Sequence, residues 1–175
     1  MRICGYCIMG NHWHLVLWPK EDGDLSRYMK WITVTHSHRW HGAHGTVGCG
    51  HLYQGRYKSF PVQSGSYYST LMRYIESNPL KAQLVKKAAD WPWSSFAIRT
   101  AITEKPITLS APVKLSSQWK RMVNNPSAMD DKIVARIENS IERGTPLGDE
   151  KWTIKTAADL NLESTIRPRG RPRKK

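Results

Sequence analysis

Two short apolar segments near the N-terminus, joined by a Gly-Asn pair, constrain the fold of this chain most strongly. The segments cover residues 3–9 and 12–18. Gly10 and Asn11 between them can adopt the positive φ angles of a tight hairpin turn. The sequence therefore predicts an antiparallel β-hairpin at the very start of the chain.

The rest of the chain alternates helical patterns with Gly- and Pro-rich breaks. Apolar residues three to four apart predict a helix over residues 25–41, with Asp24 as its cap. A strand is expected over residues 52–63, where a Pro places its end at a sheet edge. Further helices are expected over residues 66–77, 129–143 and 150–160. Together these elements predict an α+β fold.

Two prolines indicate where the chain divides. Pro106 and Pro112 mark a boundary at about residues 103–115. We expect a first domain over residues 1–102, a helical lobe over residues 103–162 that binds DNA, and a basic tail over residues 163–175. Two helices separated by a Gly/Pro turn also fit a helix-turn-helix, although this arrangement is common.

The charge balance points to a polyanionic partner. Lys and Arg number 27 against 14 Asp and Glu, which gives a net charge of +13 at pH 7. Nucleic acid is the first candidate and an anionic membrane surface the second. No apolar segment approaches the roughly 20 residues of a membrane span, and no signal peptide is recognisable. Because the cysteines number only 3, a disulfide framework is disfavoured, and we interpret the protein as cytoplasmic.

Two histidines on the second predicted strand carry the first sign of chemistry. His12 and His14 are separated by one residue, so on a strand their imidazoles share a face while Trp13, Leu15 and Leu17 lie on the other, where we expect the core. This spacing suits chelation of a metal ion, although two ordinary strand histidines have the same spacing.

A second group of candidate residues lies on the helix expected at residues 66–77. Tyr74 and Asn78 are four residues apart, which places a phenol and an amide on one helical face. If His12, His14 and Asn78 bind one divalent cation, Tyr74 can attack a phosphodiester as nucleophile. Imidazole and amide ligands are compatible with Mg²⁺ or Mn²⁺ and do not select between them.

Four motifs in this order resemble one protein family. They are residues 6–19 with His-Trp-His at their centre, 50–59 (GHLYQGRYKS), 73–79 (RYIESNP) and 91–95 (WPWSS). In this combination they are similar to the REP-associated tyrosine transposases, which belong to the single-tyrosine HUH transposases. The terminal residues 160–172 also resemble the tail of many relatives.

The resemblance implies a transposase, a metal-dependent endonuclease and strand transferase acting on single-stranded or hairpin-forming repeat DNA. Its tyrosine would cut one strand and form a 5′-phosphotyrosine link. Carried over, the resemblance makes His12 and His14 the metal ligands, Tyr74 the nucleophile and Asn78 the third ligand. Glu76 is a reserve ligand only. The implied fold is a ferredoxin-like antiparallel sheet with helices, and residues 1–102 would form its catalytic domain.

This chain departs from the family pattern at its start. The family usually has Pro at the position of Gly10, a minor change since Gly tolerates the same turn. Relatives also place a strand and a helix ahead of the histidine hairpin, so we expect an N-terminally incomplete sheet with an unpaired edge, and lowered stability.

A structural zinc module is one alternative. Cys4 and Cys7 form a CxxC pair, and Cys49, His51 and the two strand histidines could complete four ligands. An odd spacing, however, sends Cys4 and Cys7 to opposite faces of a regular strand, which disfavours this arrangement.

A DNA-binding protein without catalysis is the other alternative. Arg169-Gly-Arg-Pro172 resembles the core of an AT-hook, which lies in the minor groove of A·T-rich DNA. The candidate DNA contacts are two residues of the expected third strand and four of the tail: Arg56, Lys58, Arg167, Arg169, Arg171 and Arg173. A tail that binds phosphates without sequence preference is the simpler reading.

Overall fold

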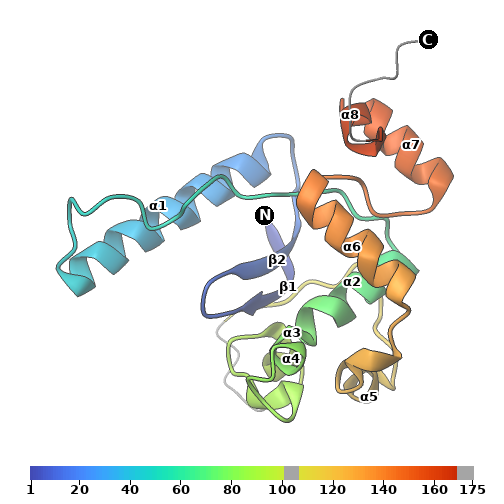
Figure 1. Cartoon of the computed structure of the whole chain (residues 1–175), viewed down its shortest axis with the longest axis horizontal. Helices are drawn as coiled ribbons and strands as arrows, with labels where there is room; N and C mark the ends of the chain where they lie inside the picture. The colour runs from blue at the N-terminus through green and yellow to red at the C-terminus, as the bar shows by residue number, and fades with distance from the viewer. Residues whose placement is uncertain (101–106, 169–175) are drawn as a thin grey trace.

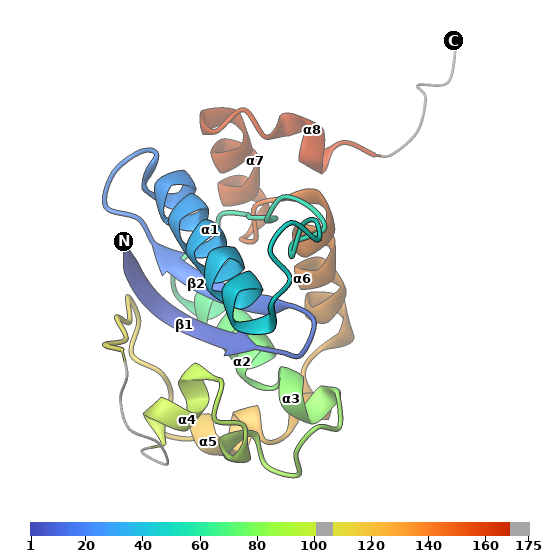
Figure 2. The same ribbon diagram turned by 90° about the vertical axis from the view of Figure 1, so that its left-hand side faces the viewer.

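A β-hairpin held between helices forms the centre of the molecule. The computed structural model describes residues 1–100 and 107–168. Strands β1 (Arg2–Ile8) and β2 (Trp13–Trp18) pair antiparallel, with Cys7 opposite His14. Helix α1 (Asp24–His44) lies on one side of this hairpin, and α2 (Ser66–Glu76) and α3 (Asn78–Lys81) lie on the other (Figures 1 and 2). The predicted hairpin is confirmed, but neither Gly10 nor Asn11 has the positive φ expected at its turn.

The remaining helices follow after α3. They are η1 (Ala88–Asp90), α4 (Ser95–Arg99), α5 (Trp119–Val123), η2 (Pro126–Ala128), α6 (Asp131–Arg143), α7 (Glu150–Asp159) and α8 (Glu163–Ile166). Asp130 and Asp149 cap α6 and α7 through their carboxylates, and α6 ends at Gly144 with a left-handed φ of 76°. The helices expected at 25–41, 66–77, 129–143 and 150–160 are all present. Asp24, predicted as a cap, is instead the first residue of α1.

The strand expected over residues 52–63 is wrong. Within the described residues only Val62 of this segment forms a β-bridge, and its partner is Leu147, after α6. Two of its aromatic side chains are engaged elsewhere: the Tyr53 hydroxyl bonds His36 of α1 and the Tyr57 hydroxyl bonds Ser26. The segment therefore runs back along α1 (Figure 1) instead of extending the sheet.

A β-bulge turns both Cys4 and Cys7 toward α2. The register shifts between Ile3 and Gly5, so Cys4 joins the cluster around Tyr68 and Met72, and Cys7 joins the cluster around Leu71 and Ile75. The prediction that these cysteines face opposite sides is wrong because it assumed a regular strand. Gly5 allows the close approach, since a Cβ there would lie 2.3 Å from the Met72 methyl carbon.

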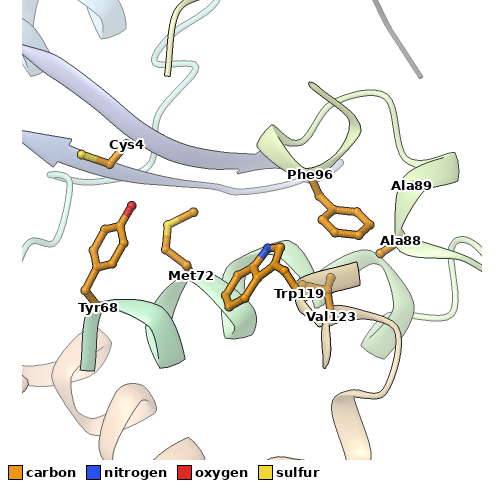
Figure 3. Close-up of a cluster of buried hydrophobic side chains, with 8 residues drawn as sticks. All are labelled: Cys4, Tyr68, Met72, Ala88, Ala89, Phe96, Trp119 and Val123. Atoms are coloured by element: carbon orange, nitrogen blue, oxygen red, sulfur yellow. The ribbon is translucent and has the colours of Figure 1, made fainter. Parts of the chain in front are cut away.

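The hydrophobic core lies on the histidine side of the hairpin. The first cluster consists of Cys4, Tyr68, Met72, Ala88, Ala89, Phe96, Trp119 and Val123 (Figure 3). The second combines Cys7, Met9, Leu71 and Ile75 with Ile137 and Leu147. Trp13, Leu15 and Leu17, expected to anchor the core, are only half-buried. Both clusters contain residues from before and after residue 102. The proposed division of the chain into domains at this residue stays a prediction.

The Trp-Pro-Trp-Ser-Ser segment covers the free edge of β1. The Ile8 N–H donates to the Trp93 carbonyl, and the Trp91 indole donates to the Ile8 carbonyl, each at 2.9 Å. Ser94 forms a β-bridge with Cys7. Trp91 packs against the second cluster, whereas Trp93 is exposed.

A fully buried carboxylate ties the parts of the core together. Glu76, the last residue of α2, accepts hydrogen bonds from the Ser95 hydroxyl (2.6 Å), the Arg99 Nε (2.9 Å) and the Trp119 indole (2.8 Å). These partners come from α4 and α5. Because the oxygens of Glu76 are engaged in this network, the residue holds the fold together and is not free to act as a reserve metal ligand.

Replacing Glu76 by Ala should destabilise the protein severely. The change leaves the Trp119 indole without an acceptor and the Arg99 guanidinium without its charged partner, with only the Cys4 carbonyl as acceptor, which costs about 3–5 kcal/mol. Urea denaturation followed by tryptophan fluorescence measures the loss. Glu150→Ala, at an exposed position in the first turn of α7, is the control; equal stabilities of the two variants would contradict the role assigned to Glu76.

Candidate active site

The two histidines of the hairpin lie side by side. The ring centroids of His12 and His14 are 5.0 Å apart, and the rings are nearly perpendicular. The pair was predicted from the spacing of the residues along a strand. His12 is exposed, just before β2, and His14 is half-buried within it.

Both imidazoles have a nitrogen free for a ligand. His12 Nδ1 is 2.7 Å from the Asn11 carboxamide oxygen; a hydrogen on Nδ1 fits this acceptor and leaves Nε2 with its lone pair. Within the described residues, neither ring nitrogen of His14 has a hydrogen-bond partner. Burial, with a smaller contribution from His12, lowers the pKa of His14 to about 4. His14 is therefore neutral at pH 7, the form that binds metals.

Tyr74 projects from α2 on the same side of the hairpin as His14. Cys7, the cross-strand partner of His14, belongs to the cluster against which Tyr74 packs. Cross-strand partners point to the same face of a sheet, so the imidazole and the phenol border one region. The Tyr74 ring is half-buried, and its hydroxyl has no hydrogen-bond partner in the described part of the chain.

The surroundings of Tyr74 keep its phenol protonated. Burial raises the pKa of Tyr74, and the carboxylate of Glu138 on α6 raises it further. The Lys81 ammonium lies 4.0 Å from the centroid of the Tyr74 ring. Any attack by this oxygen near pH 7 must therefore be accompanied by loss of the phenolic proton.

Asn78 begins α3, two residues after Glu76, the last residue of α2. Ser77 joins the two helices with φ −90° and ψ −5°, so the chain continues in a right-handed helical sense. Pro79 fits because its missing N–H is not needed in the first turn. The carboxamide of Asn78 is half-buried and, within residues 1–100 and 107–168, makes no hydrogen bond, so its oxygen is free to bind a cation.

The three ligand candidates fit a divalent cation by their chemistry. Two imidazole nitrogens and one amide oxygen are donor atoms of the type that such a cation accepts. Among the described residues, no group of three or more His, Cys, Asp or Glu side chains is arranged to hold a metal ion. Asn78 as the third ligand therefore stays a prediction.

The zinc alternative finds no support in the positions of the cysteines. Cys4 and Cys7 are buried in different clusters, and Cys49 is exposed in the loop after α1. Burial raises the pKa of the Cys7 thiol to about 12, with a smaller contribution from Glu76, and burial also raises the pKa of Cys4. Both thiols therefore remain protonated packing groups.

The candidate DNA contacts are scattered. Arg56 and Lys58 are exposed in the loop between α1 and α2. Arg167 is exposed at the end of α8, where its carbonyl accepts a hydrogen bond from Arg143. Arg169, Arg171 and Arg173 lie outside the described residues. His36 is exposed and bonds the Tyr53 hydroxyl at 2.6 Å.

Sequence reasoning missed the role of Glu76 and the charged neighbours of Tyr74. Glu76 is close to Tyr74 in the sequence, and its partner Ser95 belongs to the Trp-Pro-Trp-Ser-Ser motif. Nothing in the sequence indicated that Glu76 and Ser95 are in contact. Lys81 lies seven residues after Tyr74, a helical spacing that could have indicated their contact. No sequence signal connects Glu138 to Tyr74.

Comparison with known proteins supports the resemblance drawn from the motifs. Residues 1–78 match the sequence model of a family described as "Transposase IS200 like". A REP-associated tyrosine transposase from Escherichia coli (strain K12) is 25% identical over 125 residues, which make up 70% of this chain and 71% of the relative. No solved structure matches the chain significantly. No helix among the described residues has the length and apolarity needed to cross a membrane.

Thiol labelling checks the packing behind the histidine pair. In the native protein, a thiol reagent at pH 8 should modify Cys49 rapidly and leave Cys4 and Cys7 unmodified, because both are buried and protonated. Cys49→Ser should therefore abolish rapid labelling, while denaturant should restore labelling of the other two thiols. Rapid modification of Cys7 in the folded protein would show that the hairpin does not pack on α2 as described.

Proposed function

We propose that this chain is a transposase that cuts and rejoins single-stranded DNA through Tyr74. The chain is a relative of the REP-associated tyrosine transposases, and its residues 1–78 match the IS200-like transposase family. The observation that carries the proposal is the paired imidazoles of His12 and His14, centred 5.0 Å apart and bordering the same core cluster as the Tyr74 ring. A protein that only binds DNA requires no such group of free donor atoms.

In the proposed reaction the Tyr74 oxygen attacks a backbone phosphorus. The new bond joins this oxygen to the 5′-phosphate, the bond from phosphorus to the 3′-oxygen breaks, and the phenolic proton leaves Tyr74 while the 3′-oxygen gains a proton. Because a phosphodiester is exchanged for another phosphodiester, a 3′-hydroxyl from a second DNA end can reverse the reaction. Strand transfer then follows without an external energy source.

His12, His14 and Asn78 would hold the divalent cation, Mg²⁺ or Mn²⁺. When bound, such a cation neutralises charge on the phosphate that is attacked. The contribution of the chain is to keep His14 neutral through burial and to orient His12 through Asn11. Burial against the second cluster restricts the Tyr74 ring, so that its hydroxyl is presented at one place.

We also propose that the hairpin and its covering helices belong to a ferredoxin-like sheet. Three observations support this: the antiparallel pairing of β1 and β2, the packing of α2 across β1, and the cover of the β1 edge by Trp93 and Ser94. In this proposal residues 1–102 carry the catalysis, and residues 103–162 and the basic tail from 163 add affinity for hairpin-forming repeat DNA.

Trapping the covalent intermediate tests the reaction. The substrate is a pool of labelled DNA hairpins with randomised single-stranded flanks, incubated with the protein in Mn²⁺ and separated under denaturing conditions. We expect a labelled protein band that Tyr74→Phe abolishes, because only the hydroxyl is removed. Tyr67→Phe, a tyrosine on the same helix, is the matched control. A band of equal strength with Tyr74→Phe would exclude Tyr74 as nucleophile.

Metal binding tests the ligands separately from catalysis. Mn²⁺ titration followed by electron paramagnetic resonance should show one site in the wild-type protein. His14→Ala should weaken this site by more than about tenfold, since even changes in the outer shell of metal sites cost 10–100-fold. His44→Ala, at the far end of α1, should leave it unchanged; equal effects of both changes would refute the histidine pair as the cation site.

A further inference from the structure

An open groove separates α1 from the loop that follows it. The groove has a volume of about 720 Å³ and is lined by one face of α1 and by residues 47–57. Figure 1 shows this loop turning back alongside the helix. We call it the α1 groove. None of the residues assigned to the metal or to nucleophilic attack lines it.

The charge of the α1 groove is entirely of one sign. Lys30 and Arg56 line it together with His38, His41 and His51, and no Asp or Glu is among its lining residues. The apolar side chains of Met29, Val34 and Leu52 line it as well. A lining that combines cationic and apolar side chains suits a ligand with flat apolar faces and anionic groups along its length.

Two tyrosine rings in the groove are held in place before any ligand binds. The Tyr53 hydroxyl is 2.6 Å from His36 Nδ1, and its ring meets Trp13 edge to face with centroids 6.2 Å apart. The Tyr57 hydroxyl is 3.3 Å from Ser26 Oγ. Rings fixed in this way can stack on bases with little loss of conformational entropy, so they are suited to be a stacking platform.

The groove also allows close approach of a bulky ligand. Gly48, Gly50 and Gly55 line its loop side, and a Cβ atom added at any of them would meet no atom within 4 Å. The loop therefore leaves open space beside the two rings. Tyr57 is itself 41% exposed, so an unpaired base can reach its face.

The groove and the histidine pair lie on opposite faces of the hairpin and share the strand β2. Trp13, which stands between His12 and His14 in the sequence, contacts Tyr53. Because the Trp13 side chain faces the α1 groove while the His14 side chain faces α2, a polymer bound in the groove has to pass around the hairpin to reach the histidine pair.

The geometry points to the α1 groove as a binding site for the unpaired nucleotides of a single DNA strand, with bases stacked on Tyr53 and Tyr57 and phosphates paired with Arg56 and Lys30. This inference rests on the proposed function only for the statement that the bound DNA strand is the one that is cut. Binding itself requires neither Tyr74 nor a metal ion, and can be measured without either.

The test uses the full-length wild-type protein in EDTA, so that no cleavage occurs. The probe is a fluorescein-labelled single strand of about 12 thymidines, and its affinity is measured by fluorescence anisotropy. We expect Tyr57→Ala and Arg56→Ala each to weaken binding by roughly fivefold or more, as loss of a stacked base does. The matched controls on α1 that do not line the groove are Trp31→Ala and Arg39→Ala, and these should change affinity by less than about twofold.

A crosslinking experiment locates the bound strand directly. With 5-iododeoxyuridine in the probe, ultraviolet light should join DNA to Tyr53 or Tyr57, identified by mass spectrometry of the peptides. Crosslinks confined to other regions, such as the basic tail, would overturn the inference. Equal loss of affinity in the groove and control variants, or equal Tyr57-dependent binding of a duplex of the same length, would also overturn it. Failure of the covalent-adduct experiment leaves this result unaffected, because no step here depends on Tyr74.

Discussion

The close contact between β1 and α2 determines the rest of the structure. At Gly5 the strand approaches α2 so tightly that no Cβ fits beside Met72, and a bulge next to it turns Cys4 into the same interface. The Glu76 carboxylate then fixes the end of α2 to α4 and α5. Because buried carboxylates are costly without partners, the bonds to Glu76 stabilise the packing of these helices against one another.

This contact also sets the position of the chemical groups. The same strand pair that places Cys7 against α2 places His14 on that face, half-buried and neutral. The same helix that buries Leu71 and Ile75 holds Tyr74 at the edge of the cluster. The site therefore needs no dedicated scaffold, since packing of the hairpin on α2 brings imidazoles and phenol to one side of the protein.

The sequence predicted the elements with strong local signals and failed where tertiary contacts decide. The hairpin at Gly10-Asn11, the helices α6 and α7 and the His12–His14 pair follow from local patterns, and all are present, although neither turn residue has the expected positive φ. Residues 52–63 have the composition of a strand, but Tyr53 and Tyr57 bond α1 instead. The prediction of which hairpin face is buried in the core was also wrong. Alternation of residues along a strand does not show where α2 packs, and the bulge at Cys4 leaves no mark in the sequence.

The account depends most on the identity of the atom that attacks DNA. Trypsin cleaves after Arg73 and Lys81, so one short peptide contains Tyr74 together with Glu76 and Asn78. Mass spectrometry of this peptide, after reaction with hairpin DNA and nuclease trimming, tests the central claim most directly. The account predicts that the peptide carries the mass of a 5′-phosphorylated nucleotide on Tyr74. A nucleotide found on another residue, with residues 74–81 unmodified, would contradict it.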